Sequence, residues 1–399
     1  MVRRSLALSC AAALCLWLVM MVFAPAAQAA GEETAAVETA VEAQAAFLSL
    51  PCRTAILIDQ DTGTVLYEKN ADQRVPIASI TKVMTLLLTF EAIHDGRLTL
   101  DTPVPVSEHA ASMGGSQIWI EPGEHFTLDE MLRAICVSSA NDAAVAVAEL
   151  VGGSEEAFVA QMNAKAAQLG MEDTTFKNAC GLDTEGHLST ARDVAVMSRA
   201  ILNECPEVLH YSGIWTDTLR GGETMLVNTN KLLRRYEGIT GLKTGTTGGA
   251  GVCISASASR DGLDLIAVVL GSSSSAERFE AATTLLDYGF SAYEAAPLPD
   301  LGGRPLYLDV TGSTVEDVPL DYTALPESLL VPKGGAGALT ARVDLPAVSG
   351  APLERGSQVG SVTILSGEQP VGSWPVRAAA DAAVLDLAGA VRLMAETFL

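Results

Sequence analysis

Three short polar motifs follow one another along this chain, and each holds residue types suited to acyl transfer. The first is Ser79-Ile80-Thr81-Lys82, the second is Ser139-Ala140-Asn141 and the third is Lys243-Thr244-Gly245. Each motif alone is weak, because it also describes an N-capping serine, a polar helix start or a hairpin edge. In this order the three supply a nucleophile, two lysines and hydrogen-bonding groups, so we interpret them as parts of one site.

The spacing of Ser79 and Lys82 places a base beside a nucleophile. A serine hydroxyl attacks poorly until a neighbouring base removes its proton. Residues three apart on a helix share a face, so the Lys82 amine is expected to reach the Ser79 hydroxyl. Lysine is a base only when neutral, and burial together with a second positive charge, for which Lys243 is the candidate, lowers its pKa.

A helix is expected to carry these two residues. Pro76 precedes it, an apolar run at 83–90 forms its body and His94-Asp95-Gly96 ends it. Ser79 then falls in the first turn, where unpaired backbone N–H groups and the helix dipole favour a developing negative charge.

The other two motifs are expected to line the opposite wall of the site. Ser139 would relay a proton between the lysines and the leaving amine, and Asn141 would hold the substrate amide. Residues 238–247 read as a turn that runs into a strand, on which Gly245 lets the backbone approach a ligand closely.

The strand of the third motif is expected to bind the substrate itself. Lys243 and Thr244 would point toward a substrate carboxylate. The backbone N–H of Thr246 would join that of Ser79 in an oxyanion hole. This chemistry uses no metal and no cofactor.

The composition of the chain indicates its structural class and argues against one kind of partner. The chain has 399 residues, of which 49% are apolar and 18% are charged, so a globular protein with two or more cores is expected. The net charge of −23 argues against nucleic acid as a partner, because phosphates would be repelled.

The N-terminus predicts export. Arg3 and Arg4 precede an apolar run at 6–23, and Ala27-Gln28-Ala29 has the small residues of a cleavage site. We interpret residues 1–29 as a signal peptide, with a retained anchor helix as the alternative, since the run is nearly long enough to span a bilayer. Residues 30–46 read as a flexible lead-in.

Five cysteines remain after residue 29, and none predicts a metal site. An odd number in an exported protein leaves at least one thiol free. No pair has metal-ligand spacing, which argues against zinc. The five are Cys52, Cys136, Cys180, Cys205 and Cys253.

The pattern of apolar and turn-forming residues changes after residue 293. Short apolar runs separated by Gly- and Pro-rich turns predict a small antiparallel β domain at 294–376. Apolar residues at three- and four-residue steps then predict an amphipathic helix at 377–399. Its polar face is more acidic than that of most helices that lie on membranes.

The motifs in their context resemble one known family. Segments from about 50 to 290 are similar to low-molecular-mass penicillin-binding proteins, the D-alanyl-D-alanine carboxypeptidases of the serine peptidase type. Besides the three motifs, the resemblance rests on an opening hairpin and on several polar segments, which are Ala55-Ile56-Leu57-Ile58-Asp59, Phe176-Lys177-Asn178, Gly186-His187, Ser189-Thr190-Ala191-Arg192-Asp193 and Asn228-Thr229-Asn230.

The resemblance implies a fold and an activity. The fold is an α/β (α+β) catalytic domain at 47–293, with a five-stranded antiparallel sheet flanked by helices, followed by an all-β sandwich. The activity is removal of the terminal D-alanine from peptidoglycan stem peptides through an acyl-enzyme, with β-lactams as inhibitors. The resemblance further implies that Arg278 binds the terminal carboxylate of the substrate, and that the C-terminal helix contacts the membrane outside the cytoplasm.

Three alternatives remain open at this point. The motifs do not separate a carboxypeptidase from a D,D-endopeptidase that cleaves cross-links. A class A β-lactamase would need a glutamate for deacylation, and Glu172 and Glu185 lie in the right window without the expected context. A non-catalytic sensor of penicillin or muropeptides would not need the full set of motifs.

Overall fold

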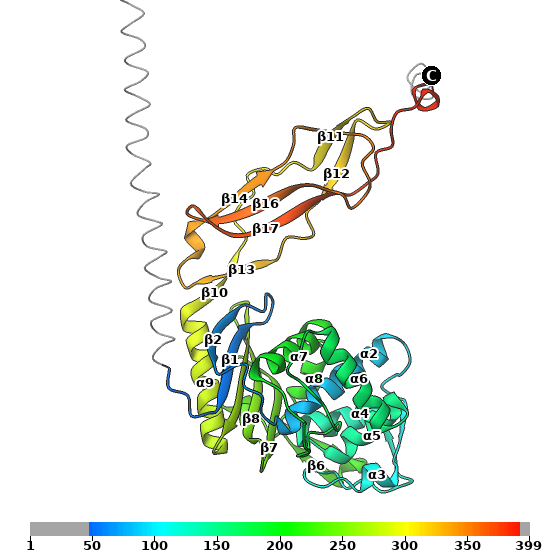
Figure 1. Ribbon diagram of the computed structural model, residues 1–399, viewed down its shortest axis with the longest axis vertical. Helices are drawn as coiled ribbons and strands as arrows, with labels where there is room; N and C mark the ends of the chain where they lie inside the picture. The colour runs from blue at the N-terminus through cyan, green and yellow to red at the C-terminus, as the bar shows by residue number, and fades with distance from the viewer. Residues whose placement is uncertain (1–47, 392–399) are drawn as a thin grey trace, which may run out of the picture. The chain divides into compact units, whose positions relative to one another are not determined.

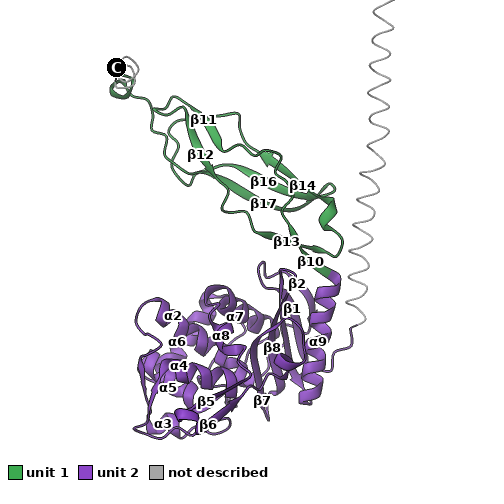
Figure 2. Cartoon of the chain, turned by 180° about the vertical axis from the view of Figure 1, so that it is seen from behind, with its two compact units in different colours: residues 1–44, 293–399 green, residues 45–292 purple. Residues whose placement is uncertain are grey.

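The computed structural model describes residues 48–391, which fall into two compact units (Figure 2). Of the described residues, 48–292 form the first unit and 293–391 form the second. The expected signal peptide at 1–29 and the lead-in at 30–46 lie outside the described residues.

A five-stranded antiparallel sheet is the frame of the first unit, as expected (Figure 1). Its strand order is β2-β1-β9-β8-β7, so the first and the last strands of this unit are assembled into one sheet. The strands are β1 (Thr54–Asp59), β2 (Val65–Lys69), β7 (Ile239–Thr247), β8 (Gly251–Arg260) and β9 (Leu263–Ser272). The third sequence motif therefore lies on an edge strand, β7.

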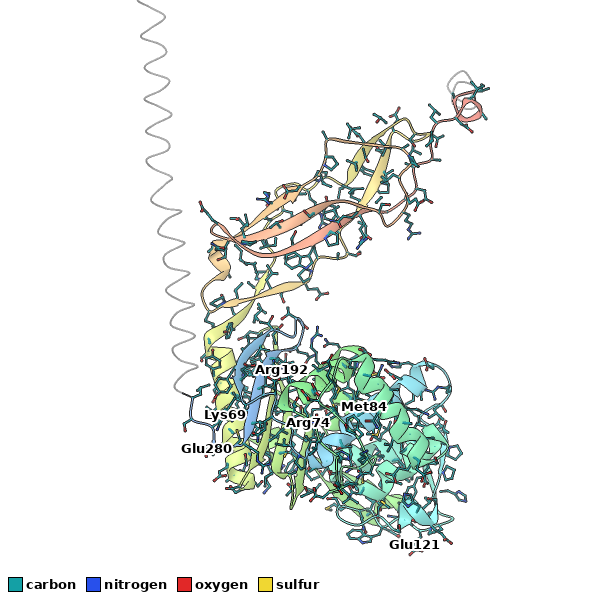
Figure 3. The ribbon with its side chains drawn as sticks, viewed as in Figure 1. Lys69, Arg74, Met84, Glu121, Arg192 and Glu280 are labelled. Carbon is teal, nitrogen blue, oxygen red and sulfur yellow. The ribbon has the colours of Figure 1, made fainter. Side chains whose placement is uncertain are left out.

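Helices cover both faces of this sheet. The long helix α9 (Ser275–Ala292) packs on one face and α7 (Ala191–Glu204) on the other. Arg192, labelled in Figure 3, ties the start of α7 to the opposite edge of the sheet through ion pairs with Glu68 and Asp72. Strands covered on both faces read as continuous apolar runs, which explains the sequence of β9.

The remaining helices build a second lobe around α2 (Lys82–His94). Ten of the 13 residues of α2 are buried, and a helix that is apolar all round belongs in the interior. The other helices of this lobe are α3 (Glu108–Ala111), α4 (Leu128–Arg133), η2 (Ala134–Ser138), α5 (Asn141–Gly152), α6 (Glu155–Gln168) and α8 (Val208–Ser212). Two short strand pairs join them, β3 (Pro103–Pro105) with β4 (His125–Thr127) and β5 (Thr216–Leu219) with β6 (Thr224–Val227). The 3-10 turns are η3 (Arg220–Gly222) and η4 (Lys231–Arg234).

Ser79 does not lie in the α-helix, which corrects the expected helix start. It lies in a 3-10 turn, η1 (Ala78–Thr81), and α2 begins at Lys82. Ala78 has a φ of 50°, a left-handed conformation through which a right-handed helix cannot propagate. The predicted end of the helix is confirmed, because α2 stops at His94 and Gly96 has a φ of 71°.

The second unit consists of strands, as predicted. A six-stranded sheet has the order β14-β16-β17-β12-β11-β15, and β10 pairs with β13 in a separate two-stranded sheet. Both sheets contribute to one apolar core, which includes Ala296, Val331 and Val362. The elements are β10 (Tyr293–Pro297), β11 (Tyr307–Thr311), β12 (Asp317–Asp321), β13 (Ser328–Pro332), η5 (Ala336–Ala338), β14 (Leu339–Asp344), β15 (Val348–Gly350), β16 (Gln358–Ser366) and β17 (Gln369–Ala378).

The C-terminal helix begins later than predicted. Strand β17 continues to Ala378, and Ala382 is buried in a small core where its backbone pairs with Leu353. Helical residues begin at Leu387, and residues 392–399 lie outside the described part. The start at 377 was wrong because alternating contacts with the β domain, rather than the apolar spacing, hold the chain extended here.

Between residues 48 and 391, no helix is both long enough and apolar enough to cross a membrane.

Candidate active site

The amine of Lys82 is the centre of the site. It donates hydrogen bonds to Ser79 Oγ at 2.9 Å, to Asn141 Oδ1 at 2.6 Å and to the backbone carbonyl of Cys180 at 2.7 Å. The predicted pairing of Ser79 and Lys82 is therefore present, and the first and second motifs meet at this nitrogen. Ser79 itself is only half-buried, so its hydroxyl is accessible from the solvent side.

Burial makes Lys82 a candidate base. Its side chain is fully buried, and desolvation of the ammonium is the main reason that its pKa falls to about 8. Cys180 and then Asp142 act in the opposite direction, and the Asp142 carboxylate forms no ion pair with Lys82. A pKa near 8 leaves about one amine in ten neutral at pH 7 and most of them neutral above pH 9.

The second lysine holds the second serine. Lys243 Nζ donates to Ser139 Oγ at 2.8 Å and to the backbone carbonyl of Thr244 at 3.0 Å. Burial, with Lys82 and then Arg278 as further causes, lowers the pKa of Lys243 well below its usual value. Ser139 has a φ of 59°, so the chain turns sharply there between η2 and α5. Motifs two and three are thus brought together as predicted.

Asn141 fixes the loop that borders the site. Its Nδ2 donates to the Gly114 carbonyl at 2.7 Å and its backbone N–H to Ser116 at 2.7 Å. The next residue, Asp142, is buried and accepts the backbone N–H groups of Ile118 and Ile120. In this structure Asn141 therefore orients Lys82 and the loop at 114–120 together.

Strand β7 runs directly beside the nucleophile. A Cβ on Gly245 would lie 3.0 Å from the backbone nitrogen of Ser79 and 2.9 Å from the carbonyl oxygen of Ile77. Glycine is needed at this crossing because a side chain would push the strand away. Thr244 hydrogen-bonds to Thr229 at 2.6 Å between their hydroxyl oxygens, and Thr246 is exposed at the end of the strand.

Arg278 lies behind the same strand. It is 6% exposed, and its guanidinium donates to the carbonyls of Cys253 at 3.2 Å and Gly245 at 3.4 Å. Its Nε is buried with no hydrogen-bond partner, and burial lowers its pKa to about 10. Arg278 lies in the first turn of α9 but is not exposed to solvent there.

Three buried cationic side chains therefore converge on one place. In the described part of the chain, none of Lys82, Lys243 and Arg278 forms an ion pair with a carboxylate. Buried charges are normally paired, so such a group is a place where an anion binds favourably. Glu172 and Glu185, the candidate glutamates of a β-lactamase, are both exposed.

Two functional contacts escaped the sequence prediction. The carbonyl of Cys180 accepts a hydrogen bond from Lys82, and a backbone carbonyl has no signal in the sequence. His187 hydrogen-bonds through Nε2 to Thr81 Oγ1 at 2.8 Å and accepts the Lys177 N–H at Nδ1. Burial lowers the pKa of His187 to about 4, so this neutral ring supports the nucleophile turn structurally.

Comparison with known proteins places the chain in a family. The family model described as D-alanyl-D-alanine carboxypeptidase matches residues 38–274. A second family model, the penicillin-binding protein 5 C-terminal domain, matches residues 307–384. The chain belongs to this family of D-alanyl-D-alanine carboxypeptidases.

Individual relatives cover between 61% and 91% of this chain. D-alanyl-D-alanine carboxypeptidase DacF of Bacillus subtilis is 39% identical over 91% of this chain and 92% of its own. Penicillin-binding protein 5 of Haemophilus influenzae has a TM-score of 0.75 and 28% identity, covering 84% of this chain and 98% of that one. Penicillin-binding protein D2 of Listeria monocytogenes, solved in a cefotaxime-bound form, has a TM-score of 0.57 and 34% identity over 61% of this chain and 98% of that one.

Gly181→Ala tests how tightly the nucleophile turn is packed. A Cβ at this position would lie 1.9 Å from the carbonyl oxygen of Ala78, and Gly181 has a φ of 86°. We expect the acylation rate by a fluorescent penicillin to fall by about 100-fold, because the clash displaces the turn that carries Ser79. The free energy of unfolding should fall by more than the ~1–2 kcal/mol cost of a left-handed alanine.

Gly186→Ala is the matched control. Gly186 has a φ of 78°, but the nearest atom to its Cβ is the flexible Lys177 Cε at 3.4 Å. This variant should lose stability from backbone strain alone and keep its acylation rate. Equal losses in the two variants would show that the contact with Ala78 is unimportant.

Proposed function

We propose that Ser79 is the nucleophile and that Lys82 is the base that takes its proton. The support is the 2.9 Å hydrogen bond between the two side chains and the depressed pKa of the Lys82 amine. As Ser79 Oγ attacks a carbonyl carbon, negative charge builds on the carbonyl oxygen. The backbone N–H groups of Ser79 and Thr246 stabilise that charge from the turn and the strand that cross at Gly245.

Ser139 and Lys243 return the proton to the leaving group. Their side chains are hydrogen-bonded at 2.8 Å, and Lys82 lies close enough to Lys243 to lower the pKa of Lys243. The C–N bond of the substrate breaks, the amine leaves with the proton, and an ester remains on Ser79. Water then adds to the ester, the Ser79–acyl bond breaks, and Ser79 regains its proton.

The observation that carries the substrate class is the set of buried basic side chains without carboxylate partners. Although the net charge of the chain is −23, Lys82, Lys243 and Arg278 are all buried around one site. A peptide ending in a free carboxylate supplies the missing negative charge. In this proposal Lys243, Thr244 and Arg278 bind that carboxylate, and Asn141 and Gly245 bind the amide next to it.

The chain is a serine-type D-alanyl-D-alanine carboxypeptidase that binds penicillin, in agreement with its family and its relatives. Its substrates are peptidoglycan stem peptides that end in D-alanyl-D-alanine. β-Lactams acylate Ser79 in place of the substrate, as the bound cefotaxime of the Listeria protein supports.

The first test is release of D-alanine from diacetyl-lysyl-D-alanyl-D-alanine by the protein without residues 1–29. We expect turnover that Ser79→Ala reduces to background, because the nucleophile is gone. Ser112→Ala is the matched control, since this exposed serine contacts only its own turn. Labelling by fluorescent penicillin without release would favour cleavage of cross-links, tested on a dimeric muropeptide, or a sensor.

The pH dependence of acylation tests the role of Lys82. Only the neutral amine accepts the Ser79 proton, so the second-order rate constant for penicillin should rise about tenfold per pH unit at low pH. It should level off above about pH 8, where Lys82 loses its charge. Stopped-flow measurement between about pH 5.5 and 9.5 checks this, with circular dichroism at each pH as the control. A flat or falling profile would contradict the assignment.

The compartment is a further part of the proposal. The N-terminal pattern at 1–29 supports export, so the site would face the peptidoglycan outside the cytoplasmic membrane. Apolar residues near the C-terminus support contact with the membrane surface, since Leu387 is 84% exposed and Val391 60%.

Removal of residues 387–399 tests the membrane contact. This cut leaves Ala382, which is buried in the β domain, in place. We expect the full mature chain to sediment with anionic liposomes and the truncated chain to stay in solution at unchanged D-alanine release. Equal sedimentation of both forms would rule the contact out.

A further inference from the structure

The C-terminal ends of two helices bring three metal-binding side chains together. His94 is the last residue of α2, Cys205 follows the last residue of α7, and Glu207 precedes α8. Lys82 begins the same helix that His94 ends, so the cluster lies about 18 Å along the helix axis from the catalytic amine. Neither the motifs nor the proposed mechanism uses these three residues.

Their ligand atoms are already close to one another. One nitrogen, one sulfur and one oxygen atom all lie within 4.8 Å of each other, and His94 Nε2 is 2.6 Å from Glu207 Oε1. Within residues 48–391, no second group of three His, Cys, Asp or Glu side chains is this compact. A thiolate, an imidazole and a carboxylate form a donor set typical of zinc.

We propose that His94, Cys205 and Glu207 bind one divalent transition-metal ion, with zinc as the preferred ion. The inference does not depend on the carboxypeptidase reaction. The three side chains supply three ligands, and a water molecule from the exposed side completes a tetrahedral set.

The backbone holds the ligands in place before the metal arrives. The Cys205 N–H donates to the Ile201 carbonyl at 2.9 Å, and the Cys205 carbonyl accepts the Val208 N–H at 3.0 Å. Pro206 stands between Cys205 and Glu207 and restricts their relative placement. Little ordering is therefore left for the ion to impose, which favours binding.

An ion can reach the cluster from solvent, and the charges of the ligands balance that of a divalent cation. Cys205 is buried, whereas the side chains of His94 and Glu207 are 47% and 38% exposed, so an ion enters between them. As the metal–sulfur bond forms, the thiol proton passes to solvent, and His94 and Glu207 exchange their mutual hydrogen bond for bonds to the ion. Thiolate and carboxylate then neutralise a divalent cation.

The surrounding charges do not oppose this binding. Glu91 and Glu204 both act electrostatically on Cys205 and add negative potential around it. Lys165 is the nearby cation, and its ammonium is occupied by an ion pair with Glu91.

A second histidine–carboxylate pair provides the matched control. His109 Nε2 lies 2.7 Å from Glu155, and the His109 side chain is 52% exposed, much like His94. Among the described residues, no third His, Cys, Asp or Glu forms a ligand group with this pair, so His109→Gln should leave metal binding unchanged. Cys52→Ser is the corresponding control for a thiol outside the cluster.

The experiment measures zinc binding to the chelator-treated mature protein by competition with a chromogenic chelator. Cobalt is used in parallel, because a thiolate ligand gives it a charge-transfer absorption in the near ultraviolet. We expect one zinc per chain and a cobalt–thiolate band. His94→Gln, Glu207→Gln and Cys205→Ser should each weaken zinc binding by more than the ~10- to 100-fold that loss of an outer-shell partner costs.

Thermal unfolding with and without zinc distinguishes a variant that has lost a metal ligand from one that no longer folds. Zinc should raise the unfolding midpoint of the parent and of both controls, but not that of the three ligand variants. If Cys205→Ser does not fold, the two exposed ligand variants decide the matter. The proposal is overturned if the parent binds no zinc, if a folded ligand variant binds as tightly as the parent, or if His109→Gln abolishes binding.

Discussion

The catalytic unit depends on one buried amine that has only neutral hydrogen-bond partners. Lys82 donates to a hydroxyl, an amide oxygen and a backbone carbonyl, and none of its hydrogen-bond partners is a carboxylate. Desolvation without ion pairing is what lowers the pKa of the amine. A single aspartate hydrogen-bonded to Lys82 would reverse that effect, and Asp142 is kept from doing so because backbone N–H groups occupy its oxygens.

The rest of the first unit positions the groups around this amine. Helix α2 is apolar on all sides and therefore buries Lys82 at its start, while β7 comes close enough to Ser79 that only glycine fits at 245. Lys243 and Arg278 approach from the sheet side, and the repulsion between these two basic groups gives the site a positive electrostatic potential. An anionic substrate relieves this repulsion, and binding energy is thereby directed to the carboxylate end of the peptide.

Much of this could be predicted from the sequence because the motifs encode side chains. The Ser79–Lys82 pair and the meeting of Ser139 with Lys243 follow from the spacing and order of the motifs, and the five-stranded antiparallel sheet was implied by the resemblance to the family. The Cys180 carbonyl was missed because any residue can supply one, and the 3-10 turn at Ser79 was missed because it depends on a strained Ala78. The late start of the C-terminal helix was missed because packing on the β domain overrides apolar spacing.

In the proposed mechanism the same lysines and serines serve both acylation and deacylation. Among the described residues, the side chains hydrogen-bonded to Ser79 and Ser139 are Lys82 and Lys243, and the candidate glutamates of a β-lactamase are exposed. In the proposed mechanism, departure of D-alanine vacates the space beside Lys82, and water then enters there to be activated. The amine released from a β-lactam stays tethered to the acyl group and blocks that space. Penicillin binding and peptide hydrolysis are therefore two outcomes of one geometry, separated by whether the leaving group can depart.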